Sequence, residues 1–389
     1  MLSVPPDASC DLLIIAGEAS GDEHAARLLE DLRESRLDLK VVAIGGPKLR
    51  DAGADLLFDL TRHAVVGIFE VLKNYGFFKK LMSDTLEWIG KVRPKAVLFV
   101  DYPGFNLRLA SSLLSQGISK KGGGEVKLLQ YVSPQLWAWK PKRRFKMART
   151  LDALGVIFPF EVETYADVDL SVRFVGHPFA REDYEPTLLY DPEGPVLLLP
   201  GSRRQPVSRI LPVLLQTFAQ VSGKRPGLHA KIVSPAGEVG ELARDILNRF
   251  SELKGKVEIF SNDKVASGCA VLTSSGTMSL ACALAGIPGA IVYLAHPMTY
   301  LLGRFLVKVP YLGMANLLLP KSPPYPEFIQ GVARPDALAK RLKTCIDDKE
   351  EAEKAMEAST SLRRLLSQPA DVSAADWLLQ AGGFEEKSS

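Results

Sequence analysis

The sequence predicts an α/β protein with two successive domains, each built on a parallel sheet. Short apolar runs recur along the chain, and many are followed by a glycine-containing turn and an amphipathic helix, the order expected of parallel strands. At 389 residues the chain is long for a single hydrophobic core. A polar, proline-bearing segment at 176–193 separates the two series and is typical of a linker.

The overall composition narrows the classes of function. Hydrophobic residues at 47% and charged residues at 24% are ordinary for a globular protein, and a net charge of +3 gives no argument for nucleic-acid binding. The four cysteines (Cys10, Cys269, Cys282 and Cys345) show neither disulfide nor metal-ligand spacing, which predicts a reducing, cytosolic environment. The histidines form no ligand pair, so we expect neither a metal nor a cofactor.

The sequence predicts neither a signal peptide nor a membrane span. Asp11 leads into the short apolar run 12–15, which is better explained as a first strand. Nowhere are 18 consecutive residues apolar. We therefore expect a soluble or, at most, a peripheral membrane protein.

The first series begins with a strand at 12–16, a turn at 17–22 and a helix at 24–33, half of a βαβ unit. Gly17 and Gly21 let a backbone or a ligand approach closely. Because the turn lacks GxGxxG spacing, it does not predict a dinucleotide. The other strands of this half are expected at 41–44, 96–100, 126–131, 153–158 and 172–175.

Asp101 follows the strand at 96–100, which is apolar enough to be buried on both faces. Pro103 and Gly104 then prevent the strand from continuing. Ligands of open parallel sheets bind beyond the carboxyl ends of the strands, so Asp101 is a candidate catalytic carboxylate. The alternative is that it caps the following helix.

Apolar residues at helical spacing predict a helix at 64–82, with two phenylalanines directly before Lys79 and Lys80. This helix either packs on the core or dips into lipid while its lysines meet anionic head groups. The second interpretation predicts that the membrane-contacting residues are Val65, Val66, Ile68, Phe69, Leu72, Phe77 and Phe78.

Trp137 and Trp139 lie beside five lysines and arginines within 133–146. Such a segment could grip a nucleic acid, or it could form the mouth of a pocket that attracts a phosphorylated or anionic ligand. Because the composition is nearly neutral elsewhere, we favour the pocket and expect no nucleic-acid partner.

The second series contains two candidate phosphate sites. The strand at 195–199 ends in a glycine turn that carries Arg203. The strand at 270–274 leads into Ser275, Gly276 and Thr277, which open a helix whose free N–H groups suit a diphosphate. Ordinary N-capping by Ser or Thr explains the same residues. Further strands are expected at 230–233, 257–260 and 290–293.

The chain ends in helices without strands, at 336–345, 350–366 and 374–380, where Trp377 is an apolar anchor. We expect the tail to pack back on the preceding domains. The predicted domains are therefore 1–178, 179–350 and a tail, 351–389, that returns to the first domain.

Eight motifs occur in order over residues 11–380. They are GEASGD at 17–22, VGIFEVL at 66–72, DYPGFN at 101–106, SPQLWAWKPKR at 133–143, GHP at 176–178, LLPGSR at 198–203, SGT at 275–277 and PEFIQ at 326–330. Together they resemble the motifs of the lipid-A-disaccharide synthases, a family of inverting glycosyltransferases. The resemblance implies the GT-B type of fold, in which two Rossmann-like domains face a central cleft.

The resemblance also implies a reaction. The family transfers 2,3-diacylglucosamine from UDP-2,3-diacylglucosamine to the 6-hydroxyl of 2,3-diacylglucosamine 1-phosphate, without a metal. Asp101 matches the general base, and Arg203 with the N–H groups of Gly276 and Thr277 would neutralise the leaving UDP. The other matching positions are Asn316 and Gln330 at the donor pocket, and Glu18, Ser20 and Asp22 beside the acceptor.

Both substrates carry acyl chains, and exposing an acyl chain to water costs ~0.8 kcal/mol per methylene. The resemblance therefore favours the lipid interpretation of 64–82 and a peripheral site on the cytoplasmic face of the Gram-negative inner membrane. Some relatives are thought to exchange C-terminal elements in a dimer, so the tail is compatible with a homodimer or a monomer.

Two positions depart from the family pattern. Ala281 stands where a glutamate usually holds the ribose hydroxyls, and Pro206 stands where an acidic residue commonly follows GSR. Losing one such bond would weaken donor binding by ~1.5–3 kcal/mol. The alternatives are another GT-B sugar-nucleotide enzyme, such as a UDP-sugar 2-epimerase, or a non-catalytic, membrane-associated binder. We expect an active enzyme, because Asp101 and the acceptor-side motifs are retained.

Overall fold

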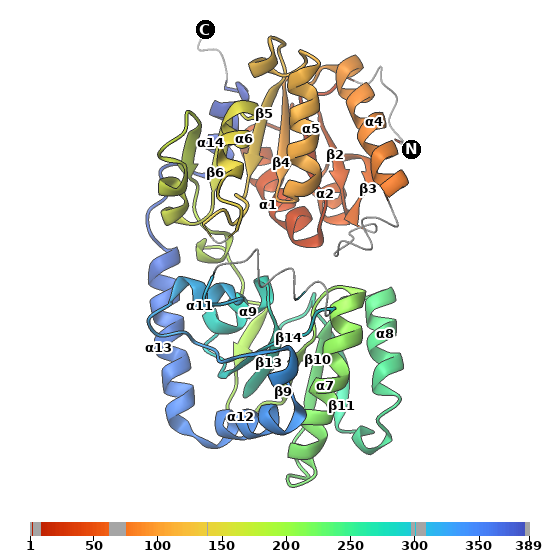
Figure 1. Cartoon of the computed structure of the whole chain (residues 1–389), viewed down its shortest axis with the longest axis vertical. Coiled ribbons are helices and arrows are strands. Elements are labelled where there is room, and N and C mark those ends of the chain that lie inside the picture. Colours follow the sequence, from red (N-terminus) through yellow and green to blue (C-terminus); the bar gives the residue numbers. More distant parts are fainter. Residues whose placement is uncertain are drawn as a thin grey trace. The chain divides into compact units, whose positions relative to one another are not determined.

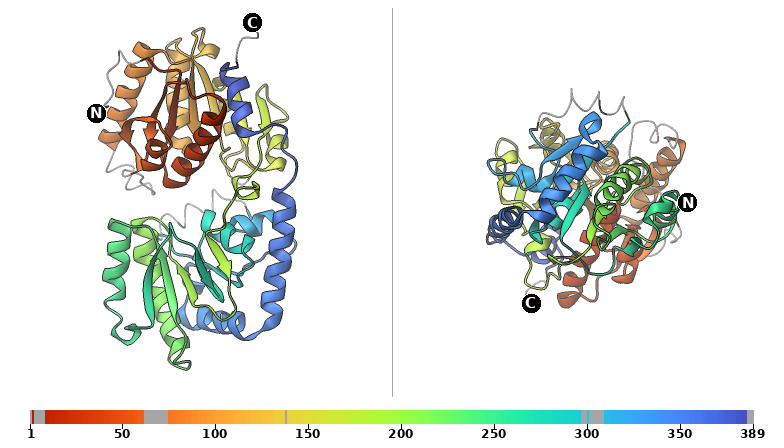
Figure 2. Two further views of the ribbon diagram at one scale, coloured as in Figure 1. Left: turned by 180° about the vertical axis from the view of Figure 1, so that it is seen from behind. Right: turned by 90° about the horizontal axis from the view of Figure 1, so that it is seen from below.

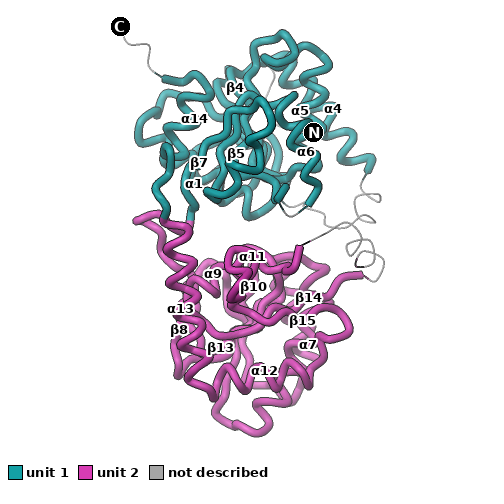
Figure 3. Tube along the Cα trace, turned by 60° about the vertical axis from the view of Figure 1, so that its left-hand side comes forward, with its two compact units in different colours: residues 1–178, 368–389 teal, residues 179–367 magenta. Residues whose placement is uncertain are grey.

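The computed structural model describes residues 2, 9–61, 75–137, 139–296, 300 and 309–385 (Figure 1). The chain forms two compact units (Figure 3). Unit 1 comprises residues 1–178 and 368–389, and unit 2 comprises residues 179–367. The tail expected as one piece at 351–389 is thus divided, with 351–367 in unit 2 and 368–389 in unit 1.

Unit 1 contains a seven-stranded parallel sheet in the order β3-β2-β1-β4-β5-β6-β7. Strands β1, β2 and β4 are buried along their whole length, as expected of apolar strands covered on both faces. The strands are β1 (Leu12–Ala16), β2 (Val41–Gly45), β3 (Asp55–Asp59), β4 (Ala96–Val100), β5 (Lys127–Tyr131), β6 (Ala153–Val156) and β7 (Ser171–Phe174).

Helices cover both faces of this sheet (Figures 1 and 2). α4 (Tyr75–Val92) and α5 (Pro103–Ser115) lie on one face, and α1 (Ala19–Ser35) and α14 (Ala374–Gly382) lie on the other. The apolar face of α1 (Ala25, Leu28, Leu29 and Leu32) is buried, as expected of an amphipathic helix that covers a sheet. Shorter helical elements are α2 (Pro47–Asp51), η2 (Lys120–Gly122), α6 (Arg143–Thr150), η3 (Pro159–Tyr165) and η4 (Pro178–Ala180).

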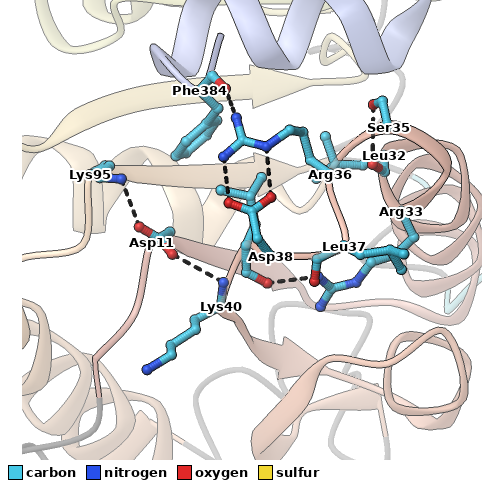
Figure 4. Close-up of polar contacts among 11 residues, drawn as sticks. Asp11, Leu32, Arg33, Ser35, Arg36, Leu37, Asp38, Lys40, Lys95 and Phe384 are labelled. Atoms are coloured by element: carbon cyan, nitrogen blue, oxygen red, sulfur yellow. Dashed lines mark hydrogen bonds and ion pairs between the residues drawn. The ribbon is translucent and has the colours of Figure 1, made fainter. Parts of the chain in front are cut away.

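The C-terminal segment of unit 1 is held by packing and by polar contacts. Trp377 of α14 is 3% exposed, and its ring lies 6.4 Å from that of Tyr131 in β5. The Lys127 ammonium donates to the carbonyl of Ala381 at 2.9 Å. Arg36, just after α1, donates to the carbonyl of Phe384 and is itself held by Asp38 (Figure 4). Residues 368–385 are therefore an integral layer of unit 1.

Unit 2 has a six-stranded parallel sheet in the order β11-β10-β9-β13-β14-β15 and a two-stranded sheet, β12-β8. The strands are β8 (Leu188–Tyr190), β9 (Val196–Leu199), β10 (Ala230–Ser234), β11 (Val257–Ser261), β12 (Ala266–Gly268), β13 (Ala270–Ser274), β14 (Gly289–Tyr293) and β15 (Glu327–Ile329). The helices are α7 (Arg204–Ser222), α8 (Glu238–Leu247), η5 (Ser251–Leu253), α9 (Thr277–Leu284), α11 (Met314–Leu318), η6 (Gln330–Val332), α12 (Pro335–Asp347) and α13 (Lys349–Leu366).

Two parallel open sheets with helices confirm the predicted α/β class with two Rossmann-like halves. Since all strands of each main sheet are parallel, their carboxyl ends share one edge, where Rossmann-like sheets bind ligands. In unit 1 this edge carries Asp101 after β4, and in unit 2 it carries Arg203 after β9 and Ser275 after β13. Over the described ranges, no helix is long and apolar enough to cross a membrane.

Candidate functional site

The turn after β4 is the most strained part of the site. Asp101 and Tyr102 have φ angles of 48° and 46°, a left-handed conformation that costs a non-glycine residue about 1–3 kcal/mol. The carbonyl of Asp101 accepts bonds from the side-chain amides of Asn106 at 2.8 Å and Gln130 at 3.4 Å, and both amides are fully buried. These bonds hold the half-buried Asp101 at the sheet edge.

The structure does not place Asp101 at the cap of α5. The N-cap residue of that helix is Tyr102. The alternative reading of Asp101 as an N-cap is therefore wrong. A carboxylate in a strained turn, braced by two buried amides, is the pattern expected where geometry serves a function.

The loop after β1 lies directly against this turn. A Cβ atom on Gly17 would lie 2.3 Å from the Tyr102 ring, so only glycine fits there. A Cβ atom on Gly21 would lie 3.9 Å from that of Asp101. The close approach brings the start of α1, with Glu18 as its N-cap residue and Ser20 in its first turn, to the side of Asp101; both residues are half-buried.

Asp22 lies in the first turn of α1 and is engaged inside the protein. It is 2% exposed, and its carboxylate accepts from the backbone N–H groups of Gly46 at 2.7 Å, Lys48 at 3.0 Å and Leu49 at 3.3 Å. Burial raises the pKa of this carboxyl group, which the three bonds oppose. Asp22 therefore anchors the start of α1 to the first turn of α2, and its predicted contact with the acceptor remains a prediction.

The strands beyond β4 add a buried polar cluster that the sequence did not single out. Glu161 is 1% exposed, and it accepts from Trp137 Nε1 at 3.3 Å and from the backbone N–H of Phe158 at 3.2 Å. Burial raises the pKa of Glu161 to about 8, so it is mostly protonated at neutral pH. Burial lowers the pKa of His177, in the GHP motif, to about 3. The sequence pattern did not indicate that Glu161 or His177 would be buried.

In unit 2 the turns after β9 and β13 meet. A Cβ atom on Gly201, whose φ is 114°, would lie 3.2 Å from Ser274 Oγ and 3.2 Å from the Pro206 side chain. This contact brings the turn of the half-buried Arg203 to the residues that open α9. Pro206 therefore packs on the glycine turn.

The start of α9 has the exposure expected of a ligand site. Ser275 is half-buried, whereas Gly276 and Thr277 are exposed. Gly276 is the N-cap residue, so capping by a Ser or Thr side chain, the alternative explanation of this motif, is wrong. Ala281, four residues into the helix, is 6% exposed and is one of the buried residues of α9.

Asn316 and Gln330, predicted at the donor pocket, are tied to neighbouring segments. Asn316 is fully buried and bonds the backbone of Tyr325 in both directions, at 2.7 and 3.0 Å, and Glu327 at 2.9 Å. Gln330 pairs with the backbone of Ala295, accepting at 2.9 Å and donating at 3.1 Å. Both amides brace the loops at this sheet edge, and direct contact with a donor remains a prediction.

The predicted membrane helix is described only from Tyr75 onward. Val65, Val66, Ile68, Phe69 and Leu72 lie outside the described residues. Phe77 and Phe78 are half-buried against the core of unit 1, where Phe77 lies 5.9 Å from Phe58 and 5.2 Å from Phe78 between ring centres. This packing buries part of each ring inside unit 1. Contact of the rings with lipid remains a prediction.

Neither a metal centre nor a disulfide is found among the residues that the structure covers. No group of three or more His, Cys, Asp or Glu residues there could hold a metal ion. All four cysteines are free thiols.

Two Rossmann-like units in one chain, each with an open parallel sheet, are the architecture of the GT-B class of proteins. A calicheamicin glycosyltransferase has this fold, with a TM-score of 0.52 and 14% identity over 98% of this chain and 100% of that one. So does a UDP-GlcNAc 2-epimerase from Neisseria meningitidis bound to UDP-GlcNAc, with a TM-score of 0.59 and 10% identity over 96% and 99%. At such identities the likeness shows the fold alone.

Sequence similarity identifies the family within this class. The model of the lipid-A-disaccharide synthetase family matches residues 12–381. Lipid-A-disaccharide synthase 1 of Legionella pneumophila is 34% identical, over 93% of this chain and 94% of its own length. Lipid-A-disaccharide synthase of Geobacter metallireducens is also 34% identical, over 91% and 92%. The chain belongs to the lipid-A-disaccharide synthase family, which confirms the predicted resemblance.

Proposed function

We propose that this chain transfers 2,3-diacylglucosamine from UDP-2,3-diacylglucosamine to the 6-hydroxyl of 2,3-diacylglucosamine 1-phosphate. The products are lipid A disaccharide 1-phosphate and UDP. Membership of the family supports the reaction. The single observation that carries the catalytic assignment is the strained Asp101–Tyr102 turn, braced by the amides of Asn106 and Gln130 at the carboxyl end of β4.

In this mechanism Asp101 is the general base. Its carboxylate takes the proton of the acceptor 6-hydroxyl while the oxygen attacks the anomeric carbon of the donor sugar. The bond between that carbon and the diphosphate breaks, UDP leaves with the electron pair, and the new bond has inverted configuration. General-base catalysis contributes about 10²–10⁴-fold, and holding the two sugars in line contributes further.

The leaving diphosphate needs positive partners in unit 2. Arg203 supplies a guanidinium, and the N–H groups of Gly276 and Thr277 supply the positive end of α9. Ser275 lies at the same turn and is assigned to donor binding with them. Asn316 and Gln330 act through the segments that they brace. Ala281 is buried in its helix, so we assign it no contact with the ribose.

We place the reaction at the cytoplasmic face of the inner membrane, with the protein bound peripherally. Both substrates carry acyl chains, which favours an enzyme that works at the bilayer surface. The apolar segment at 64–82 is the proposed contact, with Lys79 and Lys80 near anionic head groups. Replacing both Phe77 and Phe78 by Ser should weaken vesicle binding while a cooperative thermal transition is retained. Loss of that transition would show that the rings serve the core alone.

UDP release tests the proposed reaction directly. The assay uses UDP-2,3-diacylglucosamine and the 1-phosphate acceptor in neutral detergent micelles with EDTA. We expect turnover by the natural chain and a loss of about 10²–10⁴-fold in Asp101→Ala. Equal rates would remove Asp101 from the mechanism, and UDP binding without turnover in either protein would show a non-catalytic binder.

A further inference from the structure

Positive charge is concentrated in one part of unit 1. Residues 103–150 hold ten lysines and arginines and a single acidic residue, Glu125, whereas the whole chain holds 48 basic and 45 acidic residues. The stretch runs from α5 through η2 and β5 to α6. The rest of the chain is therefore net negative, and this segment is a local cationic feature.

Three of these cations gather at the start of α6. The Lys140 ammonium lies 4.2 Å from the centre of the Trp139 ring, and the Arg143 guanidinium lies 5.3 Å from it. Lys146 follows Arg143 by three residues and so shares its face of the helix. Trp139 itself is 38% exposed, unlike Trp137, which donates to the buried Glu161. We call Trp139, Lys140, Arg143 and Lys146 the α6 cation cluster.

The cluster is not neutralised by the protein. Within the described part of the chain, Lys140, Arg143 and Lys146 form no ion pair. By contrast, Arg144 of the same helix is bound bidentately by Asp167, at 2.6 and 2.5 Å. Loss of solvation and the neighbouring Arg143 lower the pKa of Lys140, and loss of solvation with the charges of Arg108, Arg143 and Arg149 lowers that of Lys146.

The position of the cluster also opposes the helix dipole. Cations are unfavourable at a helix N-terminus, yet the first turn of α6 contains Arg143 and Arg144 and no acidic residue. Lys140 has a left-handed φ of 53°, a further local cost. A site that breaks several local rules together indicates a function that requires an anion.

The cluster lies at the same edge of the unit 1 sheet as Asp101. α5 begins two residues after Asp101, and α6 begins beyond the carboxyl end of the neighbouring strand, β5. The two helices pack together, and packed helices lie about 8–10 Å apart. A sugar whose 6-hydroxyl meets Asp101 can therefore extend the substituent on carbon 1 toward the start of α6.

We infer that Lys140, Arg143 and Lys146, beside the Trp139 ring, bind the phosphate group on carbon 1 of the acceptor sugar. The inference rests on the proposed function. A phosphomonoester carries close to two negative charges at neutral pH, more than the single charge of a phosphodiester, and so suits three clustered cations. The cluster thereby selects the phosphorylated acceptor over the same sugar without phosphate.

The test compares the acceptor with its 1-dephospho analogue in neutral detergent micelles. In Arg143→Gln we expect kcat/KM for the phosphorylated acceptor to fall by about 10–100-fold, mainly through KM, with little change for the analogue. Arg143→Lys should restore part of the preference. Arg144→Gln is the matched control, because Asp167 already neutralises that charge. An equal loss for both acceptors, or an unchanged ratio, would overturn the inference.

Binding measurements separate this inference from the proposed function. Equilibrium binding of the two acceptors, followed by tryptophan fluorescence, needs no turnover. One outcome is that the natural chain releases no UDP while Arg143→Gln selectively loses binding of the phosphorylated acceptor. That result would support the phosphate site and reject the proposed transferase reaction. If Arg143→Gln instead loses binding to phosphatidylglycerol vesicles or to single-stranded RNA, with acceptor preference intact, the cluster serves those polyanions and our assignment is wrong.

Discussion

At the scale of single residues, the site depends on side chains that never need to touch a substrate. Asn106 and Gln130 hold the Asp101 carbonyl, and Asp22 ties the start of the neighbouring helix α1 to α2. Each is buried, so its hydrogen bonds are not exchanged for water. The conformation of Asp101 is thus fixed before substrates arrive, which is how a carboxylate gains from positioning.

Gly17 provides a sharp test of that preorganisation. In Gly17→Ala the new methyl group would overlap the Tyr102 ring, so the ring and the adjoining Asp101 must shift. We expect kcat to fall by about 10–100-fold, because small misplacements of a catalytic group are costly. Gly104→Ala is the control, since a Cβ atom there has no neighbour within 4 Å among the described atoms. Similar kcat values for both variants would show that the contact is unimportant.

Glu161 predicts a pH dependence of stability. Its folded pKa of about 8 lies above its ordinary value of 4.5, so the folded state holds a proton that the unfolded state has released. Stability therefore falls as pH rises from 4.5 to 8. The effect of His177 on stability has the opposite sign: below pH 6.5 the unfolded state gains a proton that the folded state does not, so stability falls as the pH is lowered. The effect of Glu161 alone appears between pH 6.5 and 8.

Glu161→Gln, which mimics the protonated acid, should remove that decline. Urea unfolding at pH 6.5 and 8 should show the free energy of unfolding falling by up to ~1.4 kcal/mol per pH unit in the natural chain, and by less in the variant. Parallel decreases in the two proteins would mean that another group titrates.

At the scale of elements, the loop around α11 is organised by one amide. Asn316 links Tyr325 to Glu327, whose carboxylate also accepts from the N–H groups of Leu312 and Gly313. These bonds join α11 to the start of β15, beside the proposed donor site. The helix has five residues, too few to be stable by itself, so the network supplies its stability.

Asn316→Ala should therefore loosen this element. The change leaves the buried backbone of Tyr325 without its partners, at a cost of about 1–3 kcal/mol. UDP binding should weaken with it, as measured by calorimetry alongside thermal unfolding. Lys321→Ala, an exposed residue of the same segment, is the control and should change neither value. Normal stability in Asn316→Ala would contradict the proposed brace.

At the scale of the whole molecule, unit 1 is built from two separate stretches of chain. Trp377 fills a space next to Gly155, where a Cβ atom would lie 3.1 Å from the indole ring. Asp371 also bonds the backbone of Phe174 at the end of β7, at 3.1 and 2.9 Å. The C-terminal segment therefore packs on β5 and β6 and forms hydrogen bonds with the end of β7.

Trp377→Ala should destabilise unit 1 selectively. Truncating a buried tryptophan costs about 3–5 kcal/mol, which lowers the melting temperature of a unit of this size by roughly 10 °C. Calorimetry should show the transition of unit 1 moving while that of unit 2 stays. Leu37→Ala, at an 80% exposed position, should shift neither. A common shift of both transitions in Trp377→Ala would show that the units unfold together.

Much of the fold could be predicted because buried parallel strands are continuous apolar runs, as in β1, β4 and β13. β3 was missed because its sequence, DLLFD, is short, half-exposed and bounded by charges. At the site, the resemblance supplied the identity of Asp22 and Asn316, but not the atoms that their side chains contact. Glu161 was missed because burial of a lone acid depends on tertiary packing.

The order of synthesis gives the divided unit 1 a consequence for biogenesis. Unit 2 is continuous in sequence, so all of its elements leave the ribosome before α14 is made. The sheet of unit 1 is translated first, but the surface that Trp377 covers stays exposed until α14 has been made. Translation of residues 179–367 at about 5–20 residues per second sets the length of that exposed period. Synthesis of residues 368–385, rather than emergence of the first stretch, is therefore the event that completes unit 1.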